Sequence, residues 1–136
     1  MSAKNLTPGI VGGEPPRGFH LDVRARGFDL TQSMYQRAID HIAAKIAKHA
    51  RVISDLTVRL QDVNGPKGGL DKRCRVEVHI AGFGPVIVDE TDQDAYVAMD
   101  VAGERLRKVV SQILDERRSR RRQAGRKLVR HVKLLH

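Results

Sequence analysis

The sequence predicts an α+β fold, a two-layer sandwich in which two helices pack on one face of a four-stranded sheet. Two observations lead to this class: stretches in which apolar and polar residues alternate, and two stretches in which apolar residues recur every three or four positions. Their order is strand-helix-strand-strand-strand-helix, and the sheet offers the only apolar surface on which both helices can pack. With no Trp, two Tyr and three Phe, the core must consist mostly of Val, Ile, Leu and Ala.

The first half of the chain supplies two strands and a helix. The alternating "FHLDVRAR", residues 19–26, predicts the first strand, and "DLTVRLQDV", residues 55–63, predicts the second. Between them, Thr31 is suited to cap a helix that runs to about Ala50. The predicted core stripe of this helix consists of Met34, Ala38, Ile39, Ile42 and Ile46.

The second half begins with a turn at "NGPKGG", residues 64–69, which leads into a third strand ending at Ile80. A further turn at 81–85 precedes "VIVDE", residues 86–90, a short fourth strand. "TDQD", residues 91–94, matches the capping box that opens a helix. The predicted core stripe of this last helix consists of Ala95, Met99, Ala102, Leu106, Val109, Val110 and Ile113. The arginine-rich sequence after Leu114 can continue the helix or be disordered, and both readings stay open.

The length of 136 residues suits one domain with tails. Residues 1–18 are rich in Gly and Pro and predict a flexible arm. We expect the folded domain over residues 19–116 and a basic extension over residues 117–136.

The single Cys74 cannot form an internal disulfide, and its place in a strand pattern predicts a small buried apolar side chain. No apolar run approaches the roughly 20 residues of a membrane span, and no secretory signal is visible. We therefore expect a cytoplasmic protein in a reducing compartment, and the leading hypothesis for its function, given below, involves no membrane.

The net charge of +9 comes from one part of the chain. Residues 1–100 hold 13 basic and 13 acidic residues, whereas residues 101–136 hold 12 basic and 3 acidic ones. Such asymmetry points to a polyanionic partner, for which nucleic acid and an anionic membrane surface both qualify, while the plainer reading is a solvated tail.

No residue constellation indicates catalysis or a metal site. His41 lies near Asp40, and the pair His131 and His136 is the only other candidate, but neither group has further ligands at matching spacing. The glycines of residues 64–69 lack the ending of a P-loop. Acidic residues at 89–94 lack EF-hand spacing and are better explained by helix capping. We predict a protein that is not an enzyme and has no cofactor, metal or small-molecule substrate.

Basic residues on the two helices are the better candidates for a functional surface. Each alone reads as an ordinary solvated helix face, but few acids follow Asp100 to compensate them. The predicted nucleic-acid-binding residues are Arg37, Lys45, Lys48, Arg51, Arg105, Arg107, Lys108, Arg117 and Arg118. Because stacking aromatic residues are scarce, recognition is expected to rest on phosphate contacts and shape, as with structured RNA.

The element order, the "NGPKGGLDKRC" loop and "TDQDAYVAMDVAGERLRKVV", with Tyr96, Ala98 and Met99, resemble the ribosome hibernation promoting factor family. That family includes ribosome-associated inhibitor A and sigma-54 modulation proteins, and the resemblance covers Phe19 to Arg118. It implies binding to the small ribosomal subunit between head and body, near the decoding centre, and silencing of translation during starvation. It also implies that basic helix residues contact ribosomal RNA, with Lys45 and Lys48 in the first helix and Arg105 and Lys108 in the second.

These observations lead to a hypothesis and two alternatives. The leading hypothesis is a ribosome-binding translation inhibitor, a monomer when free, whose partner is the small subunit and its ribosomal RNA. Only 18 residues follow Arg118, too few for the extra domain with which long members of the family pair ribosomes. One alternative is a general binder of structured RNA or DNA without a ribosomal site. The other is a membrane-surface or protein-partner module that uses the "KLVRHVKLLH" tail.

Overall fold

The computed structural model describes residues 18–63 and 72–134, with side chains described as far as Gly125. The elements in chain order are β1 (His20–Arg26), α1 (Gln32–Ala38), the π-helical turn η2 (Ile39–Ala43), α2 (Ala44–Ile46), the 3₁₀ segment η3 (Ala47–Val52), β2 (Ile53–Asp62), β3 (Lys72–Ile80), β4 (Gly84–Asp92) and α3 (Ala95–Leu134). The predicted order and the α+β class are confirmed.

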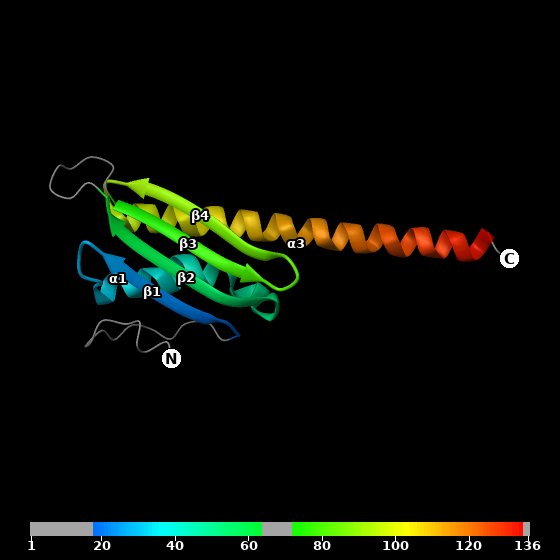
Figure 1. The fold of residues 1–136 in the computed structure, drawn as a ribbon, viewed down its shortest axis with the longest axis horizontal. Coiled ribbons are helices and arrows are strands. Elements are labelled where there is room, and N and C mark those ends of the chain that lie inside the picture. Colours follow the sequence, from blue (N-terminus) through cyan, green and yellow to red (C-terminus); the bar gives the residue numbers. More distant parts are fainter. Residues whose placement is uncertain (1–17, 64–71, 135–136) are drawn as a thin grey trace.

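The four strands form one sheet in the order β1-β2-β3-β4. β1 and β2 are parallel, as the intervening helical run allows, whereas β2, β3 and β4 are antiparallel neighbours. The helical run of residues 32–52 and α3 lie together on one face of the sheet (Figure 1). No helix of the described residues covers the other face, and we call it the open face of the sheet.

Alternation along the strands decides which side chains enter the core. Val23, Val58 and Val76 are fully buried beneath the helices, while their chain neighbours Arg24, Arg59 and Arg75 point to the open face. From the helices, Ile42 and Leu106 complete the same core without exposure to solvent. Burial of one such side chain stabilises the fold by about 1.5–3 kcal/mol, so this apolar layer fixes the arrangement of helices on the sheet.

The predicted first helix is present over residues 32–52, but it is not α-helical throughout. Thr31 caps it as expected, its Oγ1 accepting a hydrogen bond from the Met34 amide at 3.1 Å. The run then widens into η2 and tightens into η3, where His49 leaves helical backbone angles. The wider π turn buries the neighbouring residues Ile42 and Ala43 together, and a strict four-residue stripe does not anticipate this.

The first residue of the predicted core stripe of this helix also differs from the prediction. Tyr35 is buried, whereas Met34 is only half-buried and packs against the margin of the core.

The fourth strand and the last helix cap also differ from expectation. β4 has nine residues rather than five, because all of it pairs with β3 from Ile80 opposite Gly84 to Lys72 opposite Asp92. Thr91 therefore belongs to the strand and does not cap α3. The Asp94 carboxylate is the cap, accepting a hydrogen bond from the Tyr96 amide at 2.8 Å.

The helix α3 extends well beyond the sheet (Figure 1), so the arginine-rich sequence continues the helix. The last buried side chain of α3 among those described is Leu114. Arg117 ties the helix to the β3–β4 turn, since its guanidinium donates to the Ala81 carbonyl at 2.8 Å. The same turn is joined to η3, because the Ala81 amide donates to the Val52 carbonyl at 2.8 Å.

Several predictions fall outside the described part of the chain. These concern the arm up to residue 17, the turn at 64–69, and the side chains of residues 126–136, His131 and His136 included. The division into residues 1–18, 19–116 and 117–136 stays a prediction. None of the helices described combines the length and the hydropathy that a membrane crossing requires.

Candidate nucleic-acid interface

The two helical runs lie side by side and point in the same direction, as the ion pairs between them show. Arg37 Nε lies 3.1 Å from Asp100 Oδ1, and further along both runs Lys45 Nζ lies 3.7 Å from Glu104 Oε2. His41 Nδ1 lies 3.3 Å from the same Asp100 oxygen. The acids of α3 thus face the cations of the first run.

Glu104 forms ion pairs with cations of both helical runs. Arg107, one turn along α3, donates to its carboxylate through Nε at 3.2 Å and through Nη2 at 2.5 Å. The hydrogen bond from Arg107, with the nearby charges of Lys45 and Lys108, lowers the pKa of Glu104 to about 2. Three of the predicted binding cations, Arg37, Lys45 and Arg107, are therefore partly neutralised by Asp100 and Glu104.

Lys48 and Lys108 are the cations of this surface that stand outside the ion pairs described above for Arg37, Lys45 and Arg107. Lys48 lies in η3, three residues after Lys45, and Lys108 lies one turn after Glu104 on α3. Both are exposed, and neither forms an ion pair with any residue that the structure describes. We call Arg37, Lys45, Lys48, Arg107 and Lys108 the helix surface.

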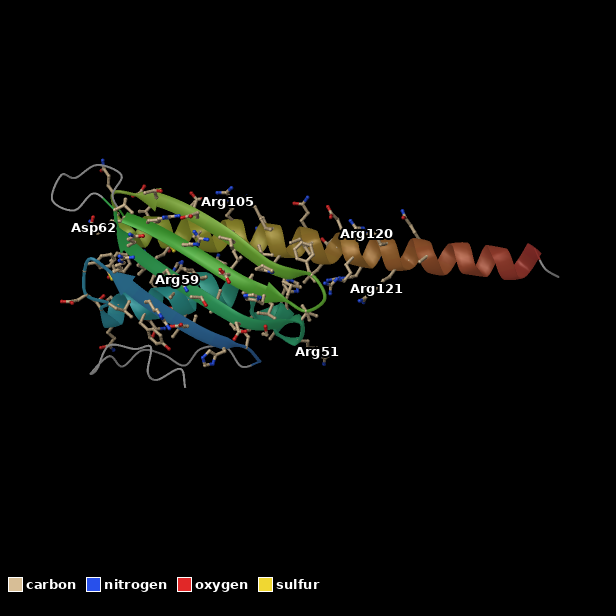
Figure 2. All side chains as sticks on the ribbon, in the orientation of Figure 1. Arg51, Arg59, Asp62, Arg105, Arg120 and Arg121 are labelled. Atoms are coloured by element: carbon tan, nitrogen blue, oxygen red, sulfur yellow. The ribbon has the colours of Figure 1, made fainter. Side chains whose placement is uncertain are left out.

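The remaining predicted residues lie elsewhere. Arg105 is on the opposite flank of α3, where its Nη1 lies 2.6 Å from Glu90 Oε1 of β4 (Figure 2). Arg51 is exposed in η3, and Arg118 lies 4.0 Å from Asp115 on its own helix. Arg117 donates a hydrogen bond to the Ala81 carbonyl. Five of the nine predicted residues thus belong to the helix surface, and the other four lie outside it.

His49 shows how the positive charge extends towards the end of α3. Burial lowers the pKa of its imidazole, and the charges of Lys48 and Arg118 lower it further. The helix surface therefore continues from Lys48 towards Arg118, across the junction of η3 and α3. Arg120 and Arg121 follow on the part of α3 that lies beyond the sheet (Figure 2).

Sequence reasoning missed a second group of cations, on the open face of the sheet. The arginines are Arg24, Arg26, Arg59, Arg73 and Arg75, and they line one shallow depression. Alternation along each strand already placed them outward, but only the strand order and register bring them together. We call these five residues the arginine cluster.

Nothing in the described residues indicates a metal centre. They contain no group of three or more His, Cys, Asp and Glu side chains placed to hold a metal ion. His41, which the sequence placed near Asp40, instead contacts Asp100, while Asp40 accepts a hydrogen bond from Gln36 at 3.0 Å.

Comparison with known proteins finds a matching family and proteins of similar structure. The family described as Sigma 54 modulation protein / S30EA ribosomal protein matches residues 21–118. A ribosomal subunit interface protein from Coxiella burnetii has a similar structure, with a TM-score of 0.56 at 15% identity, covering 71% of this chain and 98% of that one. The N-terminal domain of Thermus thermophilus Protein Y gives a TM-score of 0.48 at 24% identity, covering 70% of this chain and 94% of that one. A search of curated protein sequences found no match.

The family match assigns this small α+β domain to the ribosome-associated class. The chain belongs to the Sigma 54 modulation protein / S30EA ribosomal protein family, because the match spans residues 21–118. The resemblance found from the sequence is thereby confirmed. Proteins of this family are ribosome-associated hibernation and modulation factors and are not enzymes, as predicted for this chain.

Proposed function

We propose that this protein is a ribosome-associated translation inhibitor of the cytoplasm, which binds small-subunit ribosomal RNA near the decoding centre under starvation or in stationary phase. The helix surface makes the contact, and the protein binds as a monomer without a small-molecule ligand. The observation that carries this proposal is the set of ion pairs that join cations and acids of the two helical runs, with the exposed Lys48 and Lys108 further along the runs outside every ion pair of the described residues. Family membership supports the ribosome as the partner.

The partly paired residues contribute in a different way. Arg37, Lys45 and Arg107 are between one third and two fifths exposed, so an approaching phosphate can compete with Asp100 and Glu104 for them. Exposed ion pairs of this kind contribute about 0–1 kcal/mol, so exchanging a carboxylate for a phosphate costs little. Asp100 and Glu104 then hold these cations in position before RNA binds.

Sedimentation with isolated small subunits at several salt concentrations tests the proposal. Each phosphate contact contributes a slope of about −0.7 to −0.9 to log affinity against log salt. Replacing Lys48 and Lys108 with Ala together should make the slope shallower by up to about two units. The matched control is Arg105→Ala, on the opposite flank of α3, which should leave the slope nearly unchanged.

A general binder of structured RNA is the second candidate, favoured by the continuation of α3 as an arginine-rich helix beyond the sheet. Bulk duplex RNA as a competitor separates the two functions. Binding of about one copy per small subunit that resists the competitor supports a defined ribosomal site. Binding that the competitor abolishes supports the general binder and contradicts the ribosomal proposal.

A further inference from the structure

The arginine cluster lies on the face of the sheet opposite to the helix surface. Its five guanidinium groups line a depression of about 520 Å³ together with Ala25, Leu60 and Gln61. Arg59 occupies the middle of this region, on β2, and its side chain is exposed (Figure 2).

Strand register places three of these arginines directly opposite one another. Arg24 pairs in register with Arg59, and Arg59 pairs in register with Arg75. Like charges directly opposite on neighbouring strands destabilise a sheet. A row of three therefore costs stability unless anions lie close to it.

Acidic side chains compensate only the two ends of this row. Asp22 lies 3.1 Å from Arg24 Nε, while Asp89 accepts a hydrogen bond from Arg73 Nε at 2.7 Å and lies 3.8 Å from Arg75. The hydrogen bond from Arg73 holds the pKa of Asp89 below its ordinary value, so this carboxylate stays charged.

Arg26 and Arg59 lack such compensation. Both are exposed, and neither forms an ion pair with a residue in the described ranges 18–63 and 72–125. Asp22 and Asp89 thus form ion pairs with three of the five arginines, which leaves the charges of Arg26 on the edge strand and of Arg59 on the central strand β2 without an ion pair among the described residues.

The chemistry of the cluster suits phosphate. Guanidinium groups bind phosphate oxygens through two parallel N–H donors, which lysine cannot do. Strands are about 4.8 Å apart, so a row across three strands spans about 10 Å, room for more than one phosphate of a single nucleic-acid strand. The fully described strands that carry the cluster, β1, β2 and β3, contribute no exposed large apolar side chain, and the exposed Ile87 of β4 lies opposite Glu77 and not opposite an arginine, whereas a protein partner would require an apolar centre.

We propose that the open face of the sheet is a second RNA-binding surface, on which the arginine cluster holds the phosphodiester backbone of an RNA strand with Arg59 at its centre. It reads no bases, because no aromatic side chain of the cluster offers a stacking surface. The inference goes beyond the proposed function, which uses the opposite face, and requires only that the protein binds RNA. With both faces engaged, the domain connects two RNA segments.

The test uses the full chain and the double variant Arg26→Ser with Arg59→Ser. Affinity is measured against salt for small ribosomal subunits and, separately, for a short RNA duplex. The expected result is a salt slope shallower by up to about two units, additive with the loss from Lys48→Ala and Lys108→Ala. Thermal unfolding should show unchanged or higher stability, because the substitutions relieve repulsion; a purely structural role predicts the reverse.

The outcomes separate this inference from the proposed function. If the intact protein binds small subunits and the double variant keeps the full slope, the second surface is wrong and the proposed function stands. If the intact protein binds only the duplex, and the variant weakens that binding, the ribosomal function fails and the second surface stands. If pyrophosphate binds the cluster while the RNA slope is unchanged, the cluster is a small-anion site and the inference is overturned.

Discussion

Gly103 of α3 lies against the backbone of His41 in η2, so closely that a Cβ on Gly103 would be 1.8 Å from the His41 carbonyl oxygen. No side chain can occupy that space without moving one helix. The contact brings Asp100 and Glu104, which flank Gly103 in sequence, opposite the cations of the first helical run. The charged helix surface therefore depends on a glycine that carries no charge itself.

Replacing Gly103 with Ala should destabilise the fold. In an isolated helix this change gains about 1 kcal/mol, but here the clash with backbone forces the helices apart, as overpacking does, at a cost of about 1–3 kcal/mol or more. For a domain of this size we expect a fall in Tm of about 4–8 °C for each net kcal/mol lost. Thermal denaturation followed by circular dichroism measures it.

The matched control is Gly125→Ala in the same helix. No atom lies within 4 Å of a Cβ built there, so the helix should gain from the better propensity of Ala without a clash. Equal stability of the two variants would contradict the close contact of α3 with η2.

The cap of α3 can be assigned by comparing Asp94→Ala with Thr91→Ala. Asp94 accepts the hydrogen bond from the Tyr96 amide, and loss of such a cap costs about 0.5–2 kcal/mol. Thr91 is exposed and belongs to β4, so its replacement should change the free energy of unfolding by less than about 0.5 kcal/mol. Urea denaturation measures the free energy of unfolding of both variants. A larger loss for Thr91→Ala than for Asp94→Ala would show that Thr91 caps α3 after all.

The pKa of Glu104 predicts an acid dependence of stability. Its folded value of about 2 lies below the ordinary 4.5, so its interactions contribute full stability above pH 4.5 and lose it as the pH falls towards 2. The difference in Tm between the wild type and Glu104→Gln should therefore shrink over that range. Added salt should reduce the difference as well, because Glu104 is 42% exposed. A difference independent of pH would mean that Glu104 does not interact through its charge.

Cys74 should be chemically inert in the folded protein. Its side chain is fully buried, and burial raises the pKa of the thiol to about 12, so almost no thiolate is present at pH 8. A thiol reagent such as dithionitrobenzoate should react only after denaturation. Fast reaction of the native protein would show that β3 opens readily or that the strand is not buried.

Patterns within single elements were enough to predict the layers of this fold. Val58 and Val76 enter the core because alternation along β2 and β3 places them on one face, and this holds whichever strands are neighbours. The local sequence was also enough to identify Thr31 as the N-cap of the first helix. It failed for Thr91, because pairing with β3 extends β4 into the residues that would otherwise have capped α3.

The sequence by itself determined the class of fold, the element order and the concentration of positive charge after residue 100, because these follow from local spacing and composition. Only the tertiary structure decided which charges meet. Arg105 and Arg107 are two residues apart, yet one contacts Glu90 of the sheet and the other Glu104 of its own helix. Likewise, Arg24, Arg59 and Arg75 form a row only through strand order and register. Ion pairs and charge clusters depend on distances between elements, which spacing along the chain does not specify.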